Sequence, residues 1–141
     1  MARCVLDASV AVRWLVREIG SDEAEQILDS DRVWLAPRLM LVEVCAAMRR
    51  KVVESELSQA DAMDAVAALS GAVNDGLIRL ADDEEVVAEA LALALRLGHK
   101  LPDCVYLALA ELEGTELATA DKRLADLARS RGVPVTLLAS A

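Results

Sequence analysis

Short apolar segments alternate with longer helical segments along the whole chain, and this alternation constrains the fold most. The segments expected to form strands are 3–7, 33–36, 77–81, 116–119 and 135–138. The segments expected to form helices are 9–18, 22–30, 37–54, 58–71, 82–97, 102–113 and 122–130. Strands that alternate with helices form parallel sheets covered by helices on both faces. The sequence therefore predicts an α/β fold.

Helix boundaries are indicated by local capping signals. Ser58 with Asp61 resembles a capping box, and so does Asp82 with Glu85. Pro37 fits the first turn of the long helix that follows the second strand. We expect residues 1–141 to form a single domain, because the chain has the length of about one domain.

The composition is that of a globular protein with an aliphatic core. Hydrophobic residues make up 55% and charged residues 28% of the chain. Phe is absent, and the aromatic residues are only Trp14, Trp34 and Tyr106. The core must therefore consist mainly of Leu, Val and Ala.

Several features predict a cytoplasmic protein without a membrane segment. No apolar run approaches the ~18 residues that span a bilayer. Asp7 and Arg13 interrupt the N-terminal apolar stretch, which excludes a signal peptide. Cys4, Cys45 and Cys104 fit neither a disulfide framework nor a zinc motif, so we expect reduced thiols of the kind found in protein cores.

The net charge of −9 argues against a protein that holds nucleic acid by bulk electrostatics. It leaves open a nucleic-acid enzyme that uses bound cations and local Arg or Lys side chains, and it also fits a basic protein partner. His99 is the single histidine, which excludes a mechanism that needs two. We expect His99 to be exposed near the end of a helix.

Four carboxylates, Asp7, Glu43, Asp103 and Asp121, interrupt or end apolar segments. Acidic side chains are seldom buried unless they are paired or bind a metal. No matching buried basic residue is expected beside them, so the pattern indicates a divalent-cation site. A site built only from oxygen ligands suits Mg²⁺ or Mn²⁺, which can also coordinate phosphate.

Each carboxylate also has a simpler interpretation. Asp7 and Asp121 end strands, where ligands bind in parallel sheets, but either residue could instead cap the next helix. Glu43 lies in the middle of an apolar helix, where the alternative is an ion pair with Arg50. Asp103 lies at a helix N-terminus, where the helix dipole stabilises a carboxylate.

Two hydroxyl groups accompany the aspartates. Ser9 follows Asp7 by two residues, and Thr119 precedes Asp121 by two. Hydroxyls at these positions could orient the carboxylates or hold a metal-bound water. The alternatives are a helix cap for Ser9 and ordinary strand formation for Thr119.

The chain resembles the PIN-domain family, and within it the VapC-type toxins of bacterial toxin–antitoxin pairs. The resemblance rests on four motifs in order: Val5-Leu6-Asp7-Ala8-Ser9-Val10, Leu41-Val42-Glu43-Val44, residues 101–110 (LPDCVYLALA) and residues 117–124 (LATADKRL). These motifs span nearly the whole chain. Cys104 departs from the pattern, since Ala is common at that position.

The resemblance implies a PIN-like three-layer α/β/α sandwich with a central parallel sheet of about five strands. It implies an endoribonuclease that depends on Mg²⁺ or Mn²⁺. Our hypothesis for its mechanism is that a metal-activated water attacks the RNA phosphorus and leaves 5′-phosphate ends. Asp7, Glu43, Asp103 and Asp121 match the catalytic and metal-binding quartet of the family, and Ser9 and Thr119 match its accompanying hydroxyls. The implied partners are RNA, a VapB-like antitoxin that blocks the site, and a second copy in a homodimer.

Two other functions remain open at this point. One is a Mg²⁺-dependent phosphohydrolase or phospho-acceptor domain with Asp7 as nucleophile, although that chemistry does not require Glu43. The other is a non-catalytic module that uses a PIN fold only to bind a partner. If RNA is the substrate, the cations that could contact its phosphates are Arg13, Arg17, Arg38, Arg50, Lys100, Lys122 and Arg123.

Overall fold

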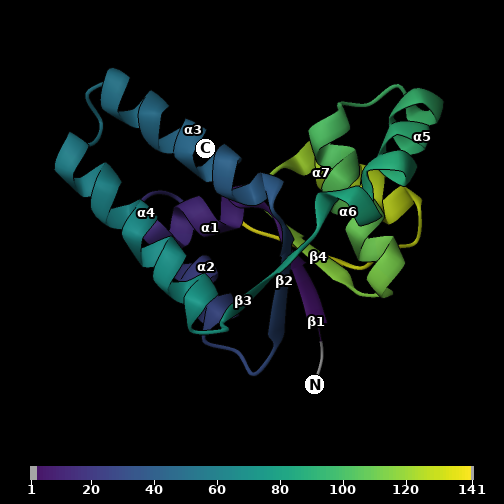
Figure 1. Cartoon of the computed structure of the whole chain (residues 1–141), viewed down its shortest axis with the longest axis horizontal. Coiled ribbons are helices and arrows are strands. Elements are labelled where there is room, and N and C mark those ends of the chain that lie inside the picture. Colours follow the sequence, from purple (N-terminus) through teal and green to yellow (C-terminus); the bar gives the residue numbers. More distant parts are fainter. Residues whose placement is uncertain (1–2, 141) are drawn as a thin grey trace.

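The computed structural model describes residues 3–140, and its centre is a parallel sheet of five strands (Figure 1). The strands are β1 (Arg3–Leu6), β2 (Val33–Pro37), β3 (Ile78–Ala81), β4 (Glu116–Thr119) and β5 (Val135–Leu137). The helices are α1 (Ala8–Leu15), α2 (Ser21–Leu28), α3 (Leu39–Val53), α4 (Gln59–Asn74), α5 (Val87–Leu97), α6 (Leu101–Glu113) and α7 (Lys122–Ser130), with a short 3₁₀ helix at Asp83–Glu85.

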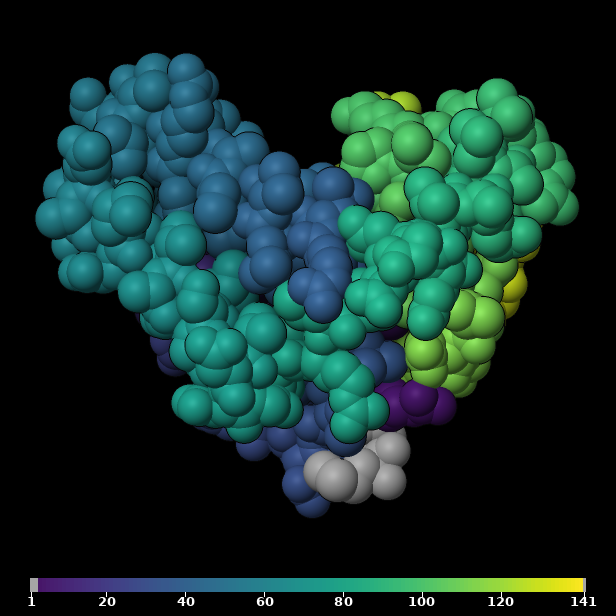
Figure 2. Space-filling model, viewed as in Figure 1, coloured from purple at the N-terminus to yellow at the C-terminus, as the bar shows by residue number. Residues whose placement is uncertain are grey.

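The sheet lies between two layers of helices. Its strand order is β3-β2-β1-β4-β5, and every neighbouring pair is parallel. Right-handed crossovers place α1–α4 on one face and α5–α7 on the other, as Figure 1 shows. The predicted three-layer α/β/α fold is therefore confirmed. In the space-filling view the surface is hollowed between the α3–α4 arm and the arm that contains α5 and α6 (Figure 2).

The strands β1 and β4 are neighbours, although more than a hundred residues separate them in the sequence. After β1 the chain continues toward β2 on one side, and after β4 it continues toward β5 on the other. Ligands of parallel sheets bind beyond the carboxyl ends of strands at such a switch point. The sequence predicts aspartates at the ends of these two strands, and the strand order places them beside each other.

The core is aliphatic with two buried aromatic side chains. Trp34 and Tyr106 are fully buried, as are the β1 residues Val5 and Leu6. Helix α6 is buried without interruption over residues 104–110 and packs against β1, β2 and β4. The small alanines in this helix let it approach the sheet closely, which is how a chain without Phe fills its centre.

Two helix starts differ from the sequence prediction. Pro37 is the last residue of β2 rather than the first turn of α3, because the residue before a proline favours extended backbone and the strand continues through it. Asp82 does not cap α5, which begins at Val87. The Asp82 carboxylate instead pairs with Arg38 at 3.2 Å, which removes it from the helix end. The Ser58 cap is confirmed, since its hydroxyl accepts the Asp61 N–H.

The cysteines are only partly as expected. Cys4 and Cys104 are buried, whereas Cys45 lies on the outer face of α3 and is exposed. The expectation of a core thiol at Cys45 is therefore wrong, because the apolar residues around it do not all face the sheet. Within residues 3–140 no helix is both long enough and apolar enough to cross a membrane.

Candidate active site

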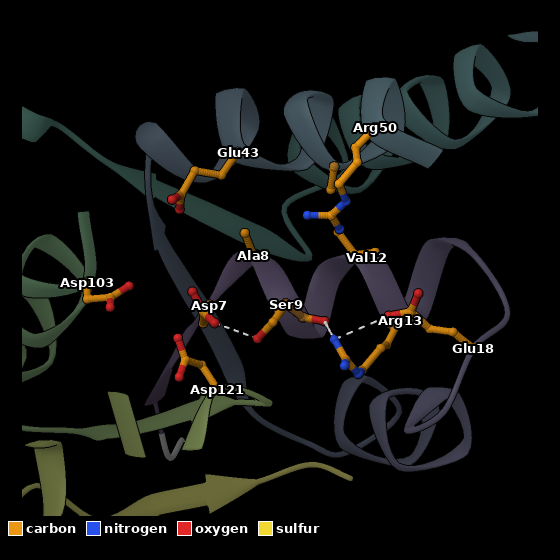
Figure 3. A pocket seen from close by; sticks show the side chains of 11 residues that line it. Asp7, Ala8, Ser9, Val12, Arg13, Glu18, Glu43, Arg50, Asp103 and Asp121 are labelled. Atoms are coloured by element: carbon orange, nitrogen blue, oxygen red, sulfur yellow. Dashed lines mark hydrogen bonds and ion pairs between the residues drawn. The ribbon is translucent and has the colours of Figure 1, made fainter. Parts of the chain in front are cut away.

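A cavity of about 390 Å³ lies beyond the carboxyl ends of β1 and β4, and all four predicted carboxylates line it (Figure 3). Asp7 follows β1 and Asp121 follows β4. Glu43 comes from the second turn of α3, and Asp103 from the first turn of α6. Figure 3 shows the four side chains pointing into the same space from different sides. The fold thus brings together residues that lie up to 114 positions apart in the sequence.

Asp7 is the buried centre of this cavity, with only 7% of its surface exposed. Its Oδ2 accepts hydrogen bonds from the Ser9 hydroxyl at 2.5 Å and from the Thr119 hydroxyl at 2.8 Å. Asp7 occupies the N-cap position of α1, as the alternative interpretation expects, but its side chain makes no capping bond to the helix.

The same two hydroxyls tie β1 to the turn after β4. Ser9 Oγ accepts the Ala120 N–H at 2.9 Å, and Thr119 Oγ1 accepts the Asp121 N–H at 3.0 Å. Each hydroxyl therefore donates to Asp7 and accepts from the backbone beside Asp121. Such a chain of bonds fixes the orientation of the buried carboxylate.

Burial raises the pKa of Asp7 from 3.8 to about 6. The hydrogen bonds from Ser9 and Thr119 oppose this shift, and repulsion from Glu43 and Asp103 adds to it. A carboxyl group that loses water and gains negative neighbours binds its proton more tightly. Ionised Asp7 therefore lowers the free energy of unfolding of the protein without metal.

Glu43 faces the cavity and is held by a tyrosine. The Tyr106 hydroxyl donates to Glu43 Oε1 at 2.5 Å, and burial followed by repulsion from Asp103 raises the pKa of Glu43. No ion pair joins Glu43 to Arg50 within residues 3–140, so that alternative is wrong. Tyr106 is fully buried, and nothing in the sequence signals its bond to Glu43.

Asp103 is bound to the single histidine. His99 Nε2 lies 2.9 Å from Asp103 Oδ2, and the His99 side chain is only 15% exposed. The expectation that His99 is exposed is therefore wrong. Gly98 ends α5 with a φ of +62°, and this turn places His99 over the start of α6. The four-residue spacing of His99 and Asp103 is the sequence feature that could have predicted their contact.

Asp121 serves two purposes. Its Oδ1 accepts the N–H groups of Arg123 at 2.9 Å and Leu124 at 3.3 Å, which caps α7. The capping interpretation of Asp121 is therefore correct, and the same side chain still lines the cavity. Capping fixes the carboxylate without neutralising its charge.

The PIN domain model of protein families matches residues 4–130 of the sequence. The chain belongs to the PIN domain family. This match confirms the resemblance that the four sequence motifs carry. No curated protein matches the chain.

Solved structures share the PIN fold with this chain at low sequence identity. PAE2754 from Pyrobaculum aerophilum has a TM-score of 0.71 and 19% identity over 95% of this chain and 89% of its own. VapC20 from Mycobacterium tuberculosis, described as a sarcin-ricin loop cleaving toxin, has a TM-score of 0.67 and 13% identity over 88% and 94%. A toxin–antitoxin complex from Klebsiella pneumoniae has a TM-score of 0.61 and 20% identity over 85% and 88%.

The lining of the PIN site fits a hard divalent cation. It offers carboxylate oxygens, and no Lys or Arg within residues 3–140 pairs with Asp7, Glu43 or Asp121. In that part of the chain no group of three or more His, Cys, Asp or Glu side chains is already arranged to hold a metal ion. The carboxylates therefore surround the cavity without forming a closed shell, which leaves space for the waters that Mg²⁺ keeps.

The pKa of Asp7 predicts how pH affects stability in the absence of metal. Asp7 is protonated up to about pH 6 in the folded protein but ionises near 3.8 when unfolded, so stability falls as pH rises through this interval. Asp7→Asn removes the penalty, and we expect it to raise the free energy of unfolding at pH 7.5 by up to about 3 kcal/mol. Denaturant unfolding in chelator measures this gain.

The gain should be much smaller at pH 4, where Asp7 is protonated in the folded protein and only about half ionised in the unfolded chain. The exposed Asp126 on α7 provides a control, since Asp126→Asn should change stability little and equally at both pH values. A less stable Asp7→Asn protein at pH 7.5 in chelator would contradict the assignment of Asp7 as a strained carboxylate.

Proposed function

We propose that this chain is a divalent-metal-dependent endoribonuclease and the toxin of a VapBC-type pair. The observation that carries the proposal is the buried Asp7 carboxylate, oriented by Ser9 and Thr119 and facing Glu43 and Asp103 across one cavity. Such an arrangement costs stability without a cation and is suited to holding one. VapC20 and the toxin–antitoxin complex from Klebsiella pneumoniae support the proposal, because this chain shares their fold.

In this proposal Asp7, Glu43, Asp103 and Asp121 hold Mg²⁺ or Mn²⁺. A bound ion of this kind lowers the pKa of a water and stabilises charge that develops on a phosphate. Ser9 and Thr119 keep Asp7 oriented, and Tyr106 does the same for Glu43. A carboxylate oxygen of the quartet would accept one proton of the attacking water as the water oxygen bonds to phosphorus. The bond between phosphorus and the 3′ oxygen breaks, and that oxygen takes a proton from solvent. The RNA is left with a 5′-phosphate and a 3′-hydroxyl.

The structure offers little for the metal-free route that uses the 2′-hydroxyl of RNA. That route needs a general base and a general acid on either side of the phosphate. His99 is the single histidine of the chain and is already bonded to Asp103.

The deciding experiment incubates the purified chain, free of any partner, with structured RNAs in Mg²⁺, in Mn²⁺ and in chelator. We expect cleavage with metal only, and a loss of roughly a hundredfold or more in Asp7→Asn and Asp103→Asn, because each removes a ligand charge. Asp126→Asn is the matched surface control and should cleave as the wild type does.

Other outcomes would contradict the proposal in different ways. Cleavage that persists in chelator or in both variants excludes the metal quartet, and 2′,3′-cyclic phosphate ends exclude attack by water. A trapped aspartyl-phosphate on Asp7 would identify the phosphohydrolase alternative. A folded protein that cleaves no RNA with either metal would identify the non-catalytic module.

We further propose a VapB-like antitoxin as partner. A groove between the end of α1 and helix α4 has apolar walls that include Leu15, Val16 and Leu57, and Asp61 and Asp64 also line it. Arg17 is the basic residue of the lining, and it pairs with Asp22 and Glu25. This lining fits a segment that carries both apolar and basic side chains. An arginine on such a segment would also be attracted to the acidic cavity.

A double variant tests the partner without touching the cavity. Asp61→Asn with Asp64→Asn should weaken binding of the small protein encoded directly upstream by about tenfold, as measured by calorimetry, because both charges face the groove. RNA cleavage by the free variant should be unchanged. Unchanged affinity would exclude this groove as the antitoxin site.

We also propose that the chain forms a homodimer through the outer face of α5. Val87, Leu91 and Leu95 recur every four residues on this face and are 45%, 50% and 76% exposed. Helix α5 carries only two charged residues, Glu89 and Arg96. In a protein with a net charge of −9, such a face is where two copies approach with least repulsion.

Substitution on this face should give monomers. We expect Leu91→Glu with Leu95→Glu to halve the mass measured by light scattering, because four like charges would meet in the dimer. Met63 on α4 is 65% exposed, so Met63→Glu is a matched control that should leave the mass unchanged. A wild-type protein that is monomeric at high concentration would exclude the dimer.

A further inference from the structure

Three of the seven cations that could contact RNA form ion pairs within the chain. Arg13, Arg17 and Arg38 each pair with a carboxylate of the same chain. Arg13 also donates to the carbonyl oxygens of Ser9 and Ile19 at 2.9 Å each, so it fastens the end of α1 to the loop that follows. These pairs offset the charges of the three side chains, so they are weaker candidates for phosphate contacts than cations without an ion pair.

Three others lie directly beside the acidic cavity without an ion pair. Arg50 lines the cavity itself. Lys100 and Arg123 line a second cavity of about 70 Å³, which shares Asp103 and Asp121 with the first. Within residues 3–140 no carboxylate lies within ion-pair distance of these three cations.

The three cations flank the carboxylates on opposite sides. Arg50 follows Glu43 by seven residues on α3, which places it on the same face roughly 10 Å further along the helix. Figure 3 shows its side chain extending into the cavity on the side away from Asp103. Lys100 and Arg123 adjoin Asp103 and Asp121 at the starts of α6 and α7. The two cavities adjoin through Asp103 and Asp121, so their linings carry unpaired cations on both sides of the carboxylates. Glu18 also lines the first cavity, but it is paired with Arg13 and Lys51.

This order of charges fits a polyanion that crosses the centre. The carboxylates repel every phosphate except one that shares their cation, whereas a free guanidinium or ammonium attracts the phosphates next to it. A mononucleotide would occupy only the middle of this surface. A strand with phosphates on both sides of the cut uses all of it.

We propose that one RNA strand crosses the acidic centre and is held on one side of the cut by Arg50 and on the other by Lys100 and Arg123. This inference rests on the proposed ribonuclease function and adds the path of the substrate. It predicts that the enzyme prefers a strand that continues on both sides of the scissile phosphate to a mononucleotide.

The first test measures binding as a function of salt. The probe is a fluorescent single-stranded RNA, and Asp103→Asn serves as the background because it should not cleave. Arg50→Gln should weaken binding roughly tenfold and lower the slope of log affinity against log salt by about 0.7, the value for one phosphate contact. Arg50→Lys should restore the slope, since it keeps the charge.

Matched controls lie on the same helices. Arg49 and Arg129 are exposed and line neither cavity, so Arg49→Gln and Arg129→Gln should leave affinity and slope nearly unchanged. Lys100→Gln with Arg123→Gln should lower the slope by about twice as much as Arg50→Gln. In the cleaving protein these changes should raise KM and leave kcat within about twofold.

The second test determines which cations contact the RNA on the 5′ side of the cut and which contact it on the 3′ side. Two RNAs are compared, one extended only 5′ of the cut and one extended only 3′ of it. Arg50→Gln should weaken binding of one of these RNAs, and the Lys100 and Arg123 double variant should weaken binding of the other. Equal losses on both RNAs, or losses no larger than those of the controls, would overturn the proposed path.

The two proposals fail in different ways. If the wild type cleaves RNA with metal but Arg50→Gln behaves as Arg49→Gln does, the path is wrong and the ribonuclease function stands. If the wild type neither binds nor cleaves RNA, both are wrong. A slope that falls equally for RNA and for a DNA strand of the same sequence supports the path, because phosphate contacts do not distinguish the sugars.

Discussion

The site depends on one buried carboxylate, that of Asp7, which follows β1 and is hydrogen-bonded to β4. Asp7 follows β1, yet one of the two hydroxyls that orient it, that of Thr119, comes from β4. The backbone shares the link, since Asp7 N–H donates to the Ala118 carbonyl at 3.0 Å. Burial of the charge is unfavourable for the protein alone. This unfavourable burial occurs at the cavity on which the ends of β1 and β4 and the starts of α3 and α6 converge.

The charged side chains around the cavity divide into those that build it and those that remain free. Lys51 is almost buried and pairs with Glu18 at 2.5 Å, and Glu18 also pairs with Arg13 at 3.3 Å. This network joins α1 to the end of α3. The charge of Lys51 is paired in this network, whereas the neighbouring Arg50 makes no ion pair in the part of the chain that the structure describes.

The proposed binding surfaces occupy different parts of the molecule. The dimer face is the outer side of α5, at the edge of one helical layer, whereas the antitoxin groove lies between α1 and α4 in the other layer (Figure 1). The RNA path runs between the two layers, across the carboxyl ends of β1 and β4. A dimer would therefore leave both the groove and the acidic cavity open.

The sequence by itself determined the α/β class, the order of elements and the four carboxylates, because apolar periodicity and charges inside apolar segments are local properties of the chain. It placed the start of α5 wrongly, since Asp82 pairs with Arg38 from a distant segment. Only the tertiary structure decided that β1 lies beside β4, that Tyr106 binds Glu43 and that His99 binds Asp103. It also decided which cations are free, because an ion pair depends on which elements pack together, and residues far apart in sequence carry no local signal of their meeting.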